Sequence, residues 1–113
     1  MNIRFNCKDV MNICNYESEM VKNIGFEASK ILKRRLFQLS AADNLSLFAP
    51  EGSPPEKCTE VSISNKKIFQ ININRYLNLF FYPLNGKKHE DTDKFVWDTV
   101  SEVCIHAVEK FND

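Results

Sequence analysis

The sequence predicts an α+β protein in which a short strand and two helices precede three or four further strands. Two observations support this prediction. Apolar residues recur at every third or fourth position between residues 8 and 39, which is the period of amphipathic helices. In several segments after residue 58 they alternate with polar residues, which is the period of half-buried strands. The 113 residues suffice for a single domain, 1–113, with one core.

The first elements are a strand and a pair of helices. Ile3 and Phe5 share one face of a strand predicted from Asn2 to Phe5. A helix is expected from about Lys8 to Gly25, since glycine adopts the left-handed conformation that ends helices. The second helix has a buried stripe made by Ala28, Ile31, Leu32, Arg35, Leu36 and Leu39. The short break between the helices predicts an αα-hairpin.

A capped turn and an irregular loop follow. Asp43 or Asn44 is well placed to cap a single turn that contains Leu45 and Phe48. The stretch from Pro50 to Pro55 contains a glycine and three prolines, so it is expected to be irregular.

The remaining elements are strands. A three-stranded meander is predicted from Lys57 to Pro83, with Asn65-Lys66-Lys67 as its first turn. Its core-facing residues are Val61 and Ile63, then Phe69, Ile71 and Ile73, then Leu77, Leu79 and Phe81. Residues 84–94 are polar and acidic, which is typical of an exposed loop. The last strand, over residues 100–108, is apolar on both faces, so it is expected to be central in the sheet.

Composition excludes several classes of protein. No apolar run is long enough to span a membrane, and residues 1–9 contain no apolar segment of a signal peptide, so a cytoplasmic protein without membrane contacts is expected. The four cysteines form no C-x-x-C pair, and together with His89 and His106 they lack metal-ligand spacing, so reduced thiols and no metal or cofactor are expected. Neither a Gly-rich phosphate loop nor an ordered Ser/His/Asp set is present, which argues against a metabolic enzyme.

The charges are divided unevenly along a chain whose net charge is zero. Residues 1–88 carry 13 Lys and Arg against 8 Asp and Glu, whereas residues 89–113 carry 2 against 7. Binding to nucleic acid would therefore need a local, shaped basic site rather than a generally basic surface. Mutual neutralisation of the two halves across the fold is the alternative.

The order of elements and several residues resemble the RelE/ParE superfamily of bacterial toxins, most closely its HigB-like, plasmid maintenance killer branch. The most specific part is Ala41-Ala42-Asp43-Asn44-Leu45, followed by Cys58 and Glu60. Gly25, Arg35-Leu36 and the Leu79, Phe81, Pro83 series also contribute, so the resemblance covers nearly the whole chain. It implies a small, twisted, mainly antiparallel sheet with an N-terminal strand and a two-helix hairpin packed on one face.

The resemblance also implies a function. Many members of this superfamily are toxins of type II toxin–antitoxin systems that enter the ribosome and cleave mRNA without a metal, and a helix-turn-helix antitoxin (HigA-like) neutralises them. Such cleavage needs a base for the ribose 2′-hydroxyl, cations for the developing charge on phosphorus and an acid for the 5′-oxygen. The cations that could supply these roles are Lys57, Lys66, Lys67 and Arg75. For Lys66 and Lys67 an ordinary solvated turn is an equal alternative.

Three positions depart from the pattern of the superfamily. Thr59 follows the cysteine where many relatives have His, Leu77-Asn78 stands in place of Tyr-Arg, and Lys110-Phe111-Asn112 replaces Asp-Tyr-His. Thr59, Asn78, Phe111 and Asn112 are therefore assigned to RNA binding, with the Phe111 ring stacking on a base. His106 is expected to be a sheet-face or core histidine. The changes leave two alternatives open: a ParE-like toxin that acts on a protein, or an inactive member that only binds its antitoxin.

Overall fold

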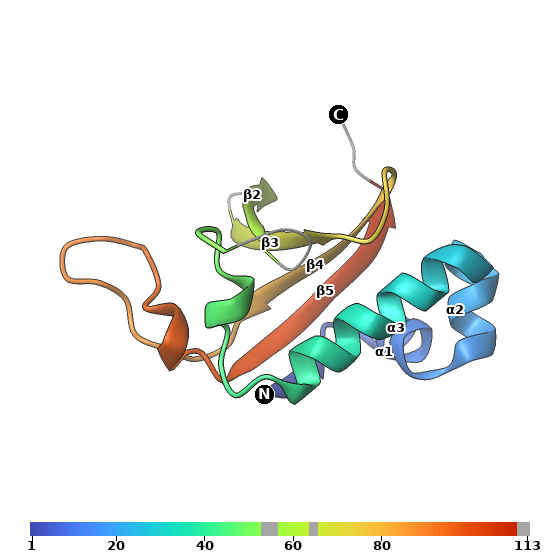
Figure 1. The fold of residues 1–113 in the computed structure, drawn as a ribbon, viewed down its shortest axis with the longest axis horizontal. Helices are drawn as coiled ribbons and strands as arrows, with labels where there is room; N and C mark the ends of the chain where they lie inside the picture. Colours follow the sequence, from blue (N-terminus) through green and yellow to red (C-terminus); the bar gives the residue numbers. More distant parts are fainter. Residues whose placement is uncertain (53–56, 64–65, 111–113) are drawn as a thin grey trace.

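A computed structural model describes residues 1–52, 57–63 and 66–110, and it places three α-helices beside one five-stranded sheet (Figure 1). In chain order the elements are β1 (Asn2–Phe5), α1 (Lys8–Asn15), α2 (Glu17–Ile24), α3 (Phe26–Ala41), the 3-10 turn η1 (Ser46–Phe48), β2 (Thr59–Ile63), β3 (Lys66–Asn72), β4 (Leu77–Pro83), the 3-10 turn η2 (Trp97–Thr99) and β5 (Glu102–Lys110). The predicted α+β class is confirmed.

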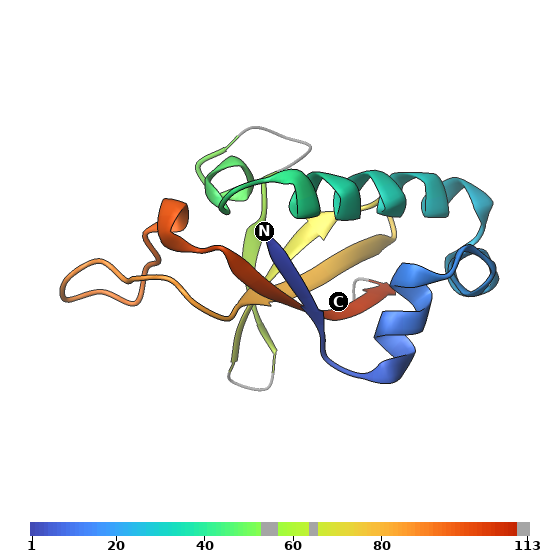
Figure 2. The same ribbon diagram turned by 90° about the horizontal axis from the view of Figure 1, so that it is seen from below.

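The sheet has the strand order β1-β5-β4-β3-β2. Strands β2 to β5 form antiparallel neighbours, whereas β1 lies parallel to β5 and pairs from Asn2 with Glu102 to Phe5 with Ile105. β5 therefore has a partner strand on each side, as its two apolar faces predict, although β4 is the middle strand of the five. α3 runs along one face of the sheet, and the β2–β3 pair twists away from it toward the opposite side (Figure 2).

The long first helix that the periodicity predicts is wrong, because Tyr16 divides it into α1 and α2. Tyr16 has extended backbone angles, φ −119° and ψ 118°, and its N–H donates to the Asn12 carbonyl. At 3.6 residues per turn, Cys14 and Met20 would lie about 120° apart around a continuous helix. The break reorients α2, so that both side chains are buried in the same core.

Gly25 joins α2 to α3 at a positive φ of 87°, as the predicted role of this glycine requires, although its ψ of 168° lies outside the left-handed helical region. The Ser29 hydroxyl donates to the Gly25 carbonyl at 2.5 Å and helps to begin α3. The predicted stripe is confirmed: Ala28, Leu32, Arg35 and Leu39 are buried. The Asn44 side-chain oxygen accepts the Ser46 N–H at 3.0 Å, but the N-cap position of η1 is Leu45, so the predicted cap is replaced by a local turn at Asn44.

The sheet packs on both faces, unequally. The face toward the helices carries the main core, whose largest fully buried members are Phe48, Phe81, Met20, Leu32, Leu39, Leu45, Ile71, Leu79 and Ile105. A smaller cluster on the other face consists of Ile68, Phe80 and Ala107, with Val61 and Ile63 packed against it. Val61 and Ile63 therefore share one face as predicted, but it is the face opposite to Phe69 and Ile71.

β5 contains a bulge at His106. Phe80 pairs with Ala107 but Phe81 pairs with Ile105, so His106 is the extra residue and has no partner in β4. Up to the bulge, Val103 and Ile105 face the main core; beyond it, Val108 does. The bulge thus explains why residues 100–108 look apolar on both faces.

The first turn of the meander differs from its prediction. Ile63 pairs with Lys66 and Ser62 with Lys67, so both lysines belong to β3 rather than to the turn. Antiparallel pairing continues to Ile63 because Val61 and Ile63 pack against Ile68 on the same face. Asn65 and residues 53–56 of the predicted loop lie outside the described residues.

The described cysteines are all free, and three of them are buried. Burial raises the pKa of the Cys14 and Cys58 thiols from 9.0 to about 12. Within the described part of the chain, no three His, Cys, Asp or Glu side chains gather as metal ligands, and no helix has both the length and the hydropathy for crossing a bilayer.

Alkaline pH is expected to destabilise the fold through these thiols. The folded-state pKa lies above that of the unfolded chain, so the neutral thiols stabilise the protein below pH 9, and this contribution is lost as the pH rises toward 12. The expected loss at pH 10 is about 1 kcal/mol per thiol. Urea unfolding of wild type and Cys58→Ala at pH 8 and 10 measures it. Between pH 8 and 10, Cys58→Ala should lose less of its free energy of unfolding than wild type. Cys7→Ala, at an exposed thiol, should lose as much as wild type. An equal loss in all three proteins would contradict the role given to the Cys58 thiol.

Candidate functional site

Two adjacent cavities lie where the loop after β4 returns to the sheet. The first, which we call the cationic hollow, has a volume of about 480 Å³. It is lined by Asn6, Lys67, Ile68, Tyr82, Pro83, Lys88, Asp93, Phe95 and His106. Three of its side chains, Lys67, Lys88 and Tyr82, can donate hydrogen bonds to an anion. A fourth, the imidazole of His106, can accept or donate a proton.

His106 and Tyr82 form the sheet side of the cationic hollow. The bulge in β5 releases His106 from the ladder and leaves it half-buried at the cavity wall, with its ring centroid 6.4 Å from that of Tyr82. A hydrogen bond between Tyr82 and Cys104, together with partial burial, raises the pKa of the Tyr82 hydroxyl above its ordinary value of 10. The Tyr82 hydroxyl therefore stays protonated at neutral pH, where it can donate a hydrogen bond.

Lys88 is positioned by a ribbon within the loop. Lys88 pairs with Phe95 in an isolated antiparallel bridge, and the Val96 N–H donates to the Lys87 carbonyl at 2.8 Å. The Lys88 ammonium lies 5.3 Å from the centroid of the Phe95 ring, a cation–π contact. The predicted loop over residues 84–94 is exposed as expected, but it is more regular than its composition indicates.

Asn85 and Gly86 attach this ribbon to the sheet. The Asn85 side-chain oxygen accepts the N–H groups of Ser101 and Glu102 at 2.9 and 3.1 Å, and its amide donates to the Ser101 hydroxyl. Gly86 follows with a φ of 108°, and its Cα lies close to Val100. These contacts fix the start of the loop beside the first residues of β5.

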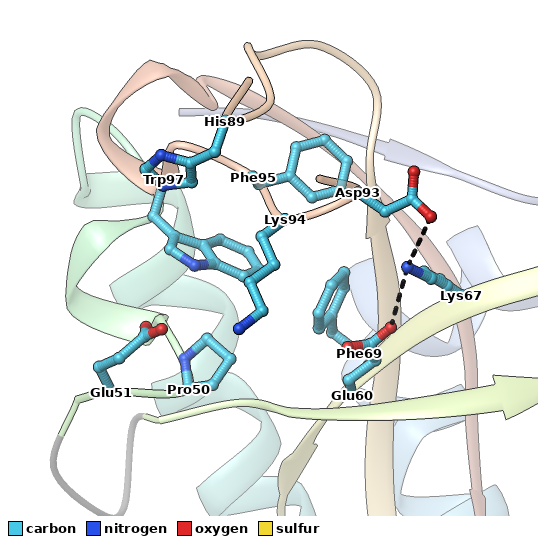
Figure 3. A pocket seen from close by; sticks show the side chains of 10 residues that line it. All are labelled: Pro50, Glu51, Glu60, Lys67, Phe69, His89, Asp93, Lys94, Phe95 and Trp97. Carbon is cyan, nitrogen blue, oxygen red and sulfur yellow. Dashed lines mark hydrogen bonds and ion pairs between the residues drawn. The ribbon is translucent and has the colours of Figure 1, made fainter. Parts of the chain in front are cut away.

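The second cavity, the aromatic hollow, has a volume of about 400 Å³. Figure 3 shows its lining, which consists of Pro50, Glu51, Glu60, Lys67, Phe69, His89, Asp93, Lys94, Phe95 and Trp97. The Trp97 ring meets Phe69 edge-on at 5.0 Å between centroids, and Phe95 lies 5.8 Å from Trp97. These three rings form one wall, and charged side chains surround it.

Lys67 belongs to both hollows. Its ammonium lies 3.7 Å from a Glu60 oxygen and 3.5 Å from an Asp93 oxygen, so it links β2 to the loop (Figure 3). About half of the Lys67 side chain is exposed, and exposed pairs of this kind contribute at most about 1 kcal/mol each. Lys67 can therefore exchange one carboxylate for another anion at low cost.

The structure does not bring the four predicted cations together. Lys57 is exposed just before β2, and Arg75 is exposed in the turn after β3. At about 3.3 Å per residue, the strand extends roughly 17 Å from Lys67 to Asn72. Arg75 lies beyond its far end, so the two cations are remote from each other. Lys66 begins β3, and only Lys67 is in the lining of a hollow.

The predicted RNA-binding residues are equally dispersed. Thr59 is exposed at the start of β2, where it pairs with Gln70. Asn78 is only 4% exposed, and its side-chain oxygen has no hydrogen-bond partner in the described structure. Phe111 and Asn112 lie outside the described residues.

Sequence reasoning missed the residues that the cationic hollow adds to Lys67. From the sequence, His106 is expected to be a sheet-face or core histidine, and no role is predicted for Tyr82 or Lys88. The available signal was the loss of strict alternation around His106, which indicates a bulge. No local pattern indicates that Lys88 returns to the sheet, because its position depends on the pairing of residues 87–96.

Comparisons with protein-family models, with curated proteins and with solved structures found no match for this chain. The resemblance to RelE/ParE toxins stays a prediction.

Proposed function

We propose that this protein is the toxin of a type II toxin–antitoxin system and that it cleaves mRNA on the ribosome without a metal ion. The observation that supports this most is the cationic hollow, where Lys67, Lys88, Tyr82 and His106 line one cavity. These are the side-chain types that RNA cleavage through the 2′-hydroxyl requires. The α+β fold with its N-terminal strand is compatible with a RelE-like arrangement.

The roles follow from the chemistry of each group. His106 accepts the proton of the ribose 2′-hydroxyl, whose oxygen then attacks the adjacent phosphorus. Lys67 and Lys88 stabilise the charge that develops on the phosphoryl oxygens. Tyr82, whose hydroxyl pKa is raised, donates a proton to the departing 5′-oxygen. The P–O5′ bond breaks as the P–O2′ bond forms, and the products are a 2′,3′-cyclic phosphate and a 5′-hydroxyl end.

The partners in this proposal are the ribosome with its mRNA and a helix-turn-helix antitoxin, all in the cytoplasm. We place the antitoxin over the helices and the basic edge of the meander. α3 supports this choice, because it exposes Phe26, Arg34 and Phe37 together with Lys30, which stacks on Phe26 at 4.4 Å. An acidic, amphipathic segment would complement such a surface.

Expression of the protein alone should arrest growth and produce site-specific breaks in translated transcripts. Lys67→Ala should relieve the arrest while lowering the free energy of unfolding by no more than about 2 kcal/mol, because both of its ion pairs are exposed. Lys22→Ala, at an exposed lysine of α2, is the matched control and should remain toxic. Co-expression of a helix-turn-helix protein from the neighbouring gene should restore growth. Normal growth with intact transcripts would refute the proposal.

A toxin that acts on a protein, or an inactive member that only binds its antitoxin, is the second candidate. Two observations favour it: Asn78 is buried where relatives carry an arginine, and Arg75 lies far from Lys67. In this case the double variant Lys66→Ala, Lys67→Ala should be as toxic as wild type, or neither should be toxic. A loss of toxicity in the double variant alone would count against it.

A further inference from the structure

We propose that the aromatic hollow binds one nucleotide of the RNA and is selective for guanine, with the base on the aromatic wall, its donor edge at Glu51 and a phosphate at Lys94. This inference rests on the proposed function, because that function makes RNA the ligand. It assigns a role to the second cavity, which the proposed chemistry leaves unused.

The aromatic wall provides a stacking surface. All three rings are in the cavity lining, where Phe69 is the buried member of the wall and Phe95 and Trp97 are half-buried. Because Trp97 meets Phe69 by an edge, the contact with Phe69 leaves ring surface of the indole for another aromatic group (Figure 3). Bases stack on aromatic side chains in single-stranded RNA recognition.

The charges of the hollow fit a ligand that carries both a donor edge and an anion. Lys67 is already shared between Glu60 and Asp93. Glu51 and Lys94, by contrast, have no ion-pair partner among the described residues. The Lys94 side chain extends from the loop across the hollow toward Pro50, which follows η1 directly before Glu51 (Figure 3). A purely basic peptide would be repelled by Lys94, and a purely acidic peptide would be repelled by Glu51. A nucleotide, which has both hydrogen-bond donors and an anionic phosphate, complements both side chains.

Guanine is the base that Glu51 selects. Its N1–H and N2 amino groups lie side by side, so one carboxylate can accept two hydrogen bonds from it. Uracil presents one N–H between two carbonyl oxygens, which a carboxylate repels. A carboxylate on this edge therefore discriminates between bases, whereas the aromatic wall does not.

The two hollows share Lys67, Asp93 and Phe95 in their linings. An RNA strand whose scissile phosphate lies in the cationic hollow can therefore place a neighbouring base in the aromatic hollow. The geometry makes the second cavity a specificity site for the reaction proposed for the first.

The test uses Trp97, the single tryptophan of the chain, as the reporter. Guanosine 5′-monophosphate should quench its fluorescence and bind about tenfold more tightly than uridine 5′-monophosphate, with both titrations corrected for light absorbed by the nucleotide. Glu51→Gln should abolish this preference by weakening the guanosine nucleotide about tenfold. Glu90→Gln, at an exposed carboxylate of the loop after β4 that is not in the lining, should keep it.

Other outcomes overturn the inference. Equal affinity for the two nucleotides would exclude a guanine site, as would quenching by an oligoarginine peptide with none by nucleotides. The proposed function is judged separately. Quenching by the guanosine nucleotide without toxicity or RNA cleavage would support the base site and refute the nuclease. RNA cleavage without quenching or base preference would support the nuclease and refute the base site.

Discussion

Replacing His106 by alanine is expected to reduce RNA cleavage at least about 100-fold, which is the lower range for removal of a general base. His106 is half-buried at the wall of the cationic hollow. It lies in a bulge and has no cross-strand partner in β4, so the substitution removes no packing against a paired side chain. The fold should therefore survive. The measurement is single-turnover cleavage of mRNA on programmed ribosomes, with circular dichroism and thermal unfolding as checks on the structure.

Chemical rescue separates catalysis by His106 from a structural role. Added imidazole can occupy the space that His106→Ala leaves and should partly restore cleavage. The same addition should not help Lys67→Ala, which lacks a cation rather than a base. Cleavage by His106→Ala within threefold of wild type would return His106 to the role that the sequence predicts for it, a sheet-face histidine.

Replacing Gly86 by alanine is expected to destabilise the protein by about 2–5 kcal/mol. The backbone there has a φ of 108°, which strains any residue with a Cβ, and that Cβ would lie 2.6 Å from a methyl group of Val100. Val100, which lies between η2 and β5, is fully buried in the main core and cannot yield without a shift of its neighbours. Urea unfolding of the variant and wild type measures the difference.

Gly25 is the matched control for Gly86. It also has a positive φ, 87°, but a Cβ at this position would meet nothing within 4 Å. Gly25→Ala should therefore carry only the backbone cost, about 1–3 kcal/mol. Equal destabilisation by the two substitutions would show that Val100 moves aside. It would then follow that the start of the loop is less tightly held than its contacts indicate.

Much of the fold could be predicted because its signals are local. The alternation of Ile3 and Phe5, the stripe from Ala28 to Leu39 and the series ending at Phe81 each follow from burial of one face. Two of the departures from the sequence prediction have a shared cause. Tyr16 interrupts a helix and His106 interrupts a strand, and in both places the burial of distant residues decides the backbone against the local period.

The site was less predictable than the fold because it is assembled from elements far apart in the chain. The sequence predicts a role for Lys67 among the basic residues of the meander, but its partner Asp93 lies on the loop after β4. Tyr82 and His106 meet only through the register of β4 with β5. Arg75 and Asn78 were chosen by position along the sequence, and the twist and pairing of the sheet place one at a remote turn and the other under neighbouring side chains.

The position of β5 also bears on when the protein can fold. β5 is an interior strand between β1 and β4, and its pairing with β1 joins residues about 100 positions apart. Such contacts form slowly because a long loop must first be closed. A nascent chain that lacks residues 102–110 has neither the strand that joins β1 to β4 nor His106. The sheet and the cationic hollow are therefore completed together, only after these residues have emerged from the ribosome that makes them.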